Sequence, residues 1–231
     1  MKTKMFLALA LLSFHSGPIF CEPDNVKEMV TRYFNSGAVN SSEGQRLILR
    51  NPDIVEGLLL SNQSNFFVRH NSFVYFLRCC YERVITTDKF MDVAFTLMMK
   101  VNNKDLLDLD SLDTIIYANA ISCFGYDAAI RKSWLSIQEN MNAFKHCLDK
   151  MLEHGFLHST RLSDALKDKI SLCQDILNEK NASRKNRAMD VLKSAEILIQ
   201  NQVTDRSSLE AKKIIPAFLK NLISQIRDTY E

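Results

Sequence analysis

Apolar residues recur along most of this chain at intervals of three and four, the spacing of an α-helix with one buried face. The clearest pattern predicts one continuous helix from Asp127 to about His154, closed by Gly155. Its apolar positions follow a heptad seam, so we expect a straight spine of about 40 Å. The seam consists of Ile130, Trp134, Ile137, Met141, Phe144, Leu148 and Met151.

Shorter amphipathic segments predict further helices on both sides of this spine. No alternating strand pattern of useful length is present, and Pro216 is expected to kink or split the last helix. We therefore predict an all-α fold, an irregular multi-helix bundle of about eight to ten helices. The expected starts before the spine are Asp24, about Leu47, Pro52, about 65, Thr87 and Asp110 or Ser111, and those after it are Ser159, about Ser183 and Ser207.

The first residues resemble a secretory signal peptide. Lys2 and Lys4 precede an apolar run over residues 5–14 that is too short to span a bilayer. We predict a signal peptide over residues 1–21, with cleavage between 16 and 21, and a secreted, extracellular protein. Whether Cys21 stays in the mature chain depends on that cleavage.

Residues 22–231 are predicted to form a single all-α domain, with a subdomain boundary near 102–110 as the alternative. No later stretch is apolar enough for a transmembrane segment. Composition fits a folded domain, because 46% of the residues are hydrophobic and only 6 Gly and 4 Pro are present. The net charge of +2 is too small to indicate a nucleic-acid partner.

Two adjacent cysteines, Cys79 and Cys80, lie in the apolar stretch FLRCCYERV. Export favours disulfides over free thiols, and neighbouring helical positions about 100° apart do not suit a bond to each other. We therefore predict that the fold is disulfide-stapled, with this pair bonded to two of Cys123, Cys147 and Cys173. The sequence does not decide which two.

Three Asn-x-Ser sequons are candidate glycosylation sites in an exported chain, at Asn40, Asn62 and Asn181. Basic residues flank the third, namely Lys180, Arg184, Lys185 and Arg187. We interpret these cations first as a solvated helix start, and contact with an anionic surface such as a glycosaminoglycan is the alternative.

A region rich in Phe and Met is the candidate site for an apolar ligand. Its residues carry more apolar bulk than one helix face needs. We interpret them first as core filling, and a helical cage around a lipid is the alternative. The ligand candidates are Phe66, Phe73, Phe76, Phe90 and Met98.

Catalytic and metal-binding motifs are missing from the sequence. No Gly-x-Ser-x-Gly elbow occurs, and Gly155 interrupts the spacing of His154 and His158. We therefore expect no catalytic residue, no metal and no cofactor, with a secreted hydrolase as a remote alternative.

These features together predict a secreted, non-catalytic helical glycoprotein that binds an extracellular protein partner or a surface. Such proteins act as effectors, as salivary or venom components, or in a cytokine-like role. The alternative function is an extracellular carrier of a lipid or another apolar small molecule. The sequence leaves the oligomeric state open.

Overall fold

The computed structural model describes residues 23–36, 41–61, 66–102, 117–118, 120–121, 136–202 and 208–229. This part of the chain contains nine helices and no strand, which confirms the all-α class. The helices are α1 (Pro23–Ser36), α2 (Ser42–Arg50), α3 (Pro52–Leu60), α4 (Phe66–Tyr81), α5 (Thr87–Asn102), α8 (Ile137–Glu153), α9 (Thr160–Asn178), α10 (Arg184–Gln202) and α11 (Leu209–Thr229).

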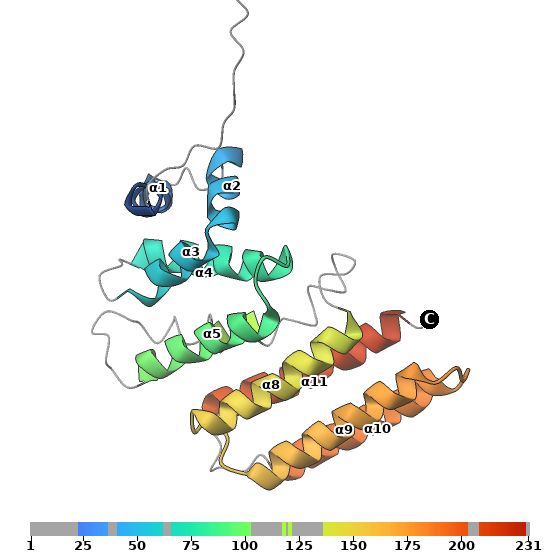
Figure 1. The fold of residues 1–231 in the computed structure, drawn as a ribbon. Coiled ribbons are helices and arrows are strands. Elements are labelled where there is room, and N and C mark those ends of the chain that lie inside the picture. The colour runs from blue at the N-terminus through green and yellow to red at the C-terminus, as the bar shows by residue number, and fades with distance from the viewer. Residues whose placement is uncertain are drawn as a thin grey trace, which may run out of the picture.

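The helices form two groups that are joined by α5 (Figure 1). Helices α1 to α4 pack on one another, and α8 to α11 form a second bundle below them in this view. Within the second bundle α8 and α11 make one layer and α9 and α10 the other, so that each helix packs on the next and α11 returns to α8. This closed ring has the arrangement of an up-and-down four-helix bundle.

Helix α8 begins later than the heptad pattern predicts. Ser136 is extended, with φ −63° and ψ 160°, and its side chain accepts a hydrogen bond from the Glu139 backbone N–H. The Glu139 carboxylate accepts in return from the Ser136 N–H, which completes a capping box. The continuous spine from Asp127 is therefore not supported. Helix α8 has 17 residues and a length of about 25 Å.

The part of the heptad seam that lies in α8 is buried as expected. Ile137, Met141, Phe144, Leu148 and Met151 all face the core. They pack between α9 and α11 on two sides and α5 on a third. The period was therefore informative about the buried face even though it gave the wrong helix start.

Polar side chains along the edge shared by α8 and α9 show how the two helices are aligned. Gln138 Nε2 donates to Asn178 Oδ1 at 3.4 Å near one end. Lys167 Nζ donates to Asp149 Oδ1 at 2.7 Å near the other. Both pairs fit one antiparallel alignment of α8 and α9. Together they hold the α9–α10 hairpin along the whole length of α8.

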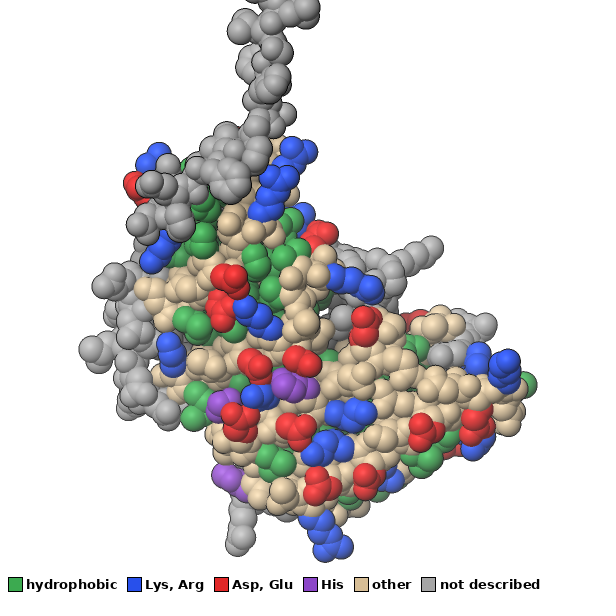
Figure 2. All heavy atoms as spheres, viewed as in Figure 1, with side chains coloured by type: hydrophobic (Ala, Val, Ile, Leu, Met, Phe, Trp, Pro, Cys, Tyr) green, Lys and Arg blue, Asp and Glu red, His purple; other side chains and the backbone are tan. Residues whose placement is uncertain are grey.

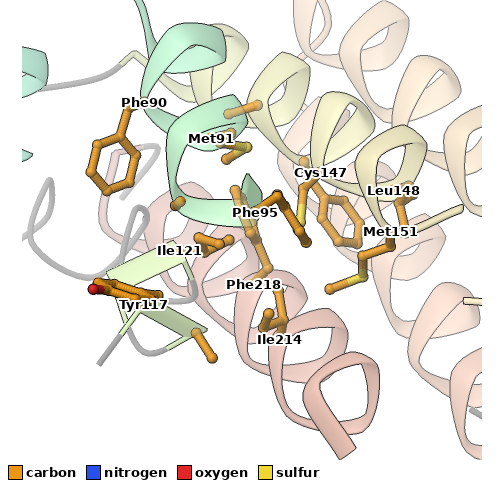
Figure 3. Close-up of a cluster of buried hydrophobic side chains, with 14 of the residues drawn as sticks. Phe90, Met91, Phe95, Tyr117, Ile121, Cys147, Leu148, Met151, Ile214 and Phe218 are labelled. Atoms are coloured by element: carbon orange, nitrogen blue, oxygen red, sulfur yellow. The ribbon is translucent and has the colours of Figure 1, made fainter. Parts of the chain in front are cut away.

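Helix α5 connects the two groups through apolar side chains. Figure 3 shows Phe95 of α5 pointing toward α8 and α11, near Cys147 and Phe218. The Phe95 ring also lies 5.9 Å from that of Phe156, which follows α8. The bundle core thus continues into α5 without an intervening polar layer.

Several helix ends agree with the expected capping residues, and others shift by one position. Ser159 caps α9, with its hydroxyl accepting from Leu162 N at 3.1 Å. At α5 the cap is Thr86 rather than Thr87. Helix α11 continues through Pro216 and is not split, and the boundary expected near 102–110 lies almost entirely outside the described residues.

None of the described helices combines the length and the hydropathy that crossing a membrane requires.

A buried polar pair links α8 to α11. Asn140 Nδ2 donates to Gln225 Oε1 at 2.8 Å, and the two residues are 0% and 6% exposed. A hydrogen bond in this setting is satisfied in only one alignment of the two helices, so the pair favours that register over its neighbours.

We expect Asn140→Ala to lower the free energy of unfolding by about 1–3 kcal/mol, because a buried Gln225 oxygen loses its donor on α8. The matched control, also on α8, is Asn142→Ala, which removes an exposed hydrogen bond that Asn142 Oδ1 accepts from Gln174 of α9 and should cost at most about 0.5 kcal/mol. Urea denaturation followed by circular dichroism measures both. Equal stabilities of the two variants would contradict the assignment.

Candidate functional site

The described cysteines are buried free thiols. Cys79, Cys80, Cys147 and Cys173 form no disulfide, so the structure does not support the predicted sulfur bridges among them. Cys123 lies outside the described residues.

The reason is that the thiols occupy different interfaces. Cys80 Sγ lies 3.9 Å from the Thr87 hydroxyl, at the turn between α4 and α5. Cys173 Sγ lies 3.8 Å from the Ala188 carbonyl oxygen, between α9 and α10. Cys147 points into the core between α5 and α11 (Figure 3).

Burial also makes these thiols poor nucleophiles. Desolvation raises the pKa of Cys79 and of Cys80 to about 11 and that of Cys173 to about 12, and it raises the pKa of Cys147 as well. At neutral pH all four are therefore protonated, which argues against a thiolate nucleophile at any of them.

The apolar-ligand candidates pack against one another in the core. Phe73 and Phe90 have ring centroids 5.6 Å apart, and Phe76 and Phe90 lie 6.1 Å apart. Met98 is fully buried and belongs to the same hydrophobic core, whereas the side chain of Phe66 is outside the described atoms. This packing gives the carrier alternative no support, and that function stays a prediction.

Two histidines of the described region take part in contacts between elements. His146 Nε2 lies 3.1 Å from Asp92 Oδ1, which links α8 to α5. The His154 ring stacks on Phe95 at 6.1 Å, and His158 is exposed beyond the turn at Gly155. Among the described residues no three His, Cys, Asp or Glu side chains gather in a metal-binding group.

A hollow that the sequence did not reveal lies between the α4–α5 turn and α8, and both apolar and polar side chains line it. It has a volume of about 370 Å³, and Cys80 forms part of its lining. Arg83 lines it too, in a left-handed conformation with φ 58°, and its guanidinium is 3.7 Å from the Glu139 carboxylate. A second carboxylate, Asp88, also lines the hollow, so its charged side chains do not favour an anionic ligand.

The turn between α9 and α10 carries the most basic of the described hollows. It has a volume of about 440 Å³ and is lined by Lys180, Asn181, Ala182, Arg184 and Lys185. We call this surface, together with Arg187, the basic tip. Figure 2 shows Lys and Arg side chains at this end of the bundle, beside acidic ones.

One carboxylate organises part of the basic tip. Glu179 forms an ion pair with Arg187, and its backbone carbonyl accepts from Arg184 Nη1 at 3.0 Å. Lys180 and Lys185, in contrast, lie within 4 Å of no carboxylate in the described part of the chain. Two cations of the tip are therefore held close together without a countercharge.

The sequons have different outcomes. Asn181 is exposed in the turn of the basic tip, and its glycosylation stays a prediction. Asn40 and Asn62 lie outside the described residues.

Comparisons with family models, with curated proteins and with solved structures returned no match to this chain. What the protein does therefore has to be inferred from its own side chains, and the basic tip is the surface with the clearest chemistry.

We expect the four thiols to resist a thiol reagent at pH 8 in the folded protein, because a pKa of about 11 leaves about one part in a thousand as thiolate. After unfolding in guanidinium without reductant, all four should be alkylated. Peptide mapping by mass spectrometry gives the result for each cysteine. Recovery of Cys79 or Cys80 in a disulfide-linked peptide would contradict the structure and restore the predicted bridges.

Phe90→Ala should lower the free energy of unfolding by about 3–5 kcal/mol, because the ring is fully buried against Phe73 and Phe76. Val74→Ala on α4 is the matched control, since Val74 is 47% exposed and its truncation should cost at most about 0.5 kcal/mol. Native mass spectrometry of the unmodified protein should show no bound apolar molecule. A small effect of Phe90→Ala together with a bound lipid would favour the carrier.

Proposed function

We propose that the protein is exported and acts without catalysis, by binding a sulfated polysaccharide surface through the basic tip. Export is inferred from the basic and apolar segment over residues 1–21. The observation that carries the binding proposal is the hollow in which Lys180 and Lys185 lie without a countercharge.

The electrostatics of α10 strengthen this proposal. Arg184, Lys185 and Arg187 lie in its first turn, which has no acidic residue. The amide groups at a helix N-terminus carry partial positive charge, so cations at this end raise the free energy of the unbound protein. A sulfate group in the hollow would relieve that repulsion and accept hydrogen bonds from the lysines and from Arg184.

Other lysines in the bundle have a different role. Lys150 lies 2.8 Å from Glu153 and 3.1 Å from Asp92, and Lys167 lies 2.7 Å from Asp149. These carboxylates raise the pKa of each lysine, and the pairs with Asp92 and Asp149 connect different helices. The charges of Lys180 and Lys185 are not used in this way, which leaves them available to a ligand.

The short length of the basic tip fits a sulfated oligosaccharide better than duplex nucleic acid. Four cations fall within residues 180–187, a density typical of heparin-binding segments. The chain as a whole carries only +2, so its net charge gives no indication of the long basic face that duplex binding uses.

Lys180→Gln/Lys185→Gln should raise the Kd for a heparin oligosaccharide on the order of tenfold, since exposed charge contacts contribute about 0.2–1 kcal/mol each. Added salt should weaken binding of the protein without substitutions, because salt screens exposed charges. Isothermal titration calorimetry at two salt concentrations measures both effects.

The matched control is Lys193→Gln/Lys213→Gln, which removes the same charge from exposed positions away from the tip. Lys193 lies further along α10, and Lys213 lies near the start of α11, at the opposite end of the bundle. This variant should bind the oligosaccharide as tightly as the protein without substitutions. An equal loss in both variants would show that net charge, and not the basic tip, determines binding.

A further inference from the structure

Asn181 combines three features of a modification site. It begins the sequon Asn181-Ala182-Ser183, and all three residues are exposed. It lies in the turn between α9 and α10, outside both helices. It also lines the hollow of the basic tip, next to Lys180.

The hydrogen bonds of this turn leave the reactive atom accessible. Asn181 Oδ1 accepts from the Ser183 backbone N–H at 2.9 Å and from the Ser183 hydroxyl at 3.1 Å. Both bonds use the oxygen, and Nδ2 donates no hydrogen bond in the described part of the chain. The sequon hydroxyl is thus already in contact with the carboxamide that would be modified, and the nitrogen faces solvent.

We propose that Asn181 is N-glycosylated during export and that the glycan controls access to the basic tip, an inference whose second half rests on the proposed function. The donor is an oligosaccharide linked to a polyprenyl diphosphate. Nδ2 forms a bond to the first sugar carbon and loses one proton to a base of the transferase. The bond from that carbon to the phosphate oxygen breaks, and the polyprenyl diphosphate leaves.

The position of the glycan explains how it would limit access to the basic tip. An oligosaccharide is bulky and solvated, and it would grow from the wall of a hollow of only about 440 Å³. Lys180 precedes the attachment residue directly, and Arg184 and Lys185 follow within the first turn of α10. The charges of the tip remain, because Asn181 is uncharged before and after modification. The effect is therefore steric, and the glycan competes with the polysaccharide for the same space.

Secretory expression of the full chain in cultured eukaryotic cells tests the modification. The unmodified sequence and Ser183→Thr should both carry a glycan on the peptide that contains Asn181, and Ser183→Ala should carry none. Ser183→Ala keeps Asn181 and every cation of the tip, and the sequons at Asn40 and Asn62 remain intact in all three proteins. Peptide mapping after endoglycosidase treatment reads occupancy at each site. An unoccupied Asn181 in protein recovered from the medium overturns the modification.

Calorimetry with a heparin oligosaccharide then tests whether the glycan limits access to the basic tip. Ser183→Ala should bind about tenfold more tightly than the glycosylated protein, comparable to the loss expected from removing both tip lysines. Trimming the glycan to its first sugar should restore most of that difference. If the protein glycosylated at Asn181 and Ser183→Ala bind the oligosaccharide equally well, the glycan does not limit access, and the proposed function stands. Failure of Ser183→Ala to bind at all overturns the proposed function, while the occupancy result still decides the modification.

Discussion

Burial of the apolar face of α8 is the constraint on which the rest of the described structure depends. Helix α8 is the element that contacts α5, α9 and α11 together, so it connects the N-terminal helices to every part of the bundle except α10. Phe144 lies 5.0 Å from Phe218 of α11, and Leu148 and Met151 are fully buried. Each such side chain contributes on the order of 1.5–3 kcal/mol when it leaves water. Without this face neither the ring of four helices nor the attachment of α5 would be stable.

The basic tip follows from the same packing. The capping box at Ser136 fixes where α8 begins, and the pairs from Gln138–Asn178 to Asp149–Lys167 fix the register of α9 against it. The end of α9 and the start of α10 are therefore brought to one end of the bundle. Because the helices bury their apolar faces against each other, the residues of the connecting turn are left in solvent with their charges concentrated there.

Much of the fold could be predicted from the sequence, because helical periodicity is local. The buried faces of α8, α9 and α11 and the cap at Ser159 follow from residues near one another in the chain. The start of α8 was missed because the heptad period is consistent with an unbroken helix, while the competing signal Ser136-x-x-Glu139 depends on side-chain hydrogen bonds. The Asn140–Gln225 pair spans 85 positions and has no local signal at all.

The candidate site was only partly predictable. The cations and the sequon of the tip could be seen in the sequence, but whether Lys180 and Lys185 meet a carboxylate depends on the packing of α9 and α10. The predicted disulfides came from the cell compartment inferred for the chain and not from geometry. The structure instead places Cys80, Cys147 and Cys173 at separate interfaces, and desolvation keeps all four described thiols protonated.

The most direct measurement of the central claim is hydrogen–deuterium exchange of the protein with and without a sulfated oligosaccharide. If the basic tip is the binding surface, slower exchange on binding should be confined to peptides that cover residues 179–187, with the core of α8 unchanged. Slowing centred on α1 to α4, or no slowing anywhere at saturating oligosaccharide, would contradict the account.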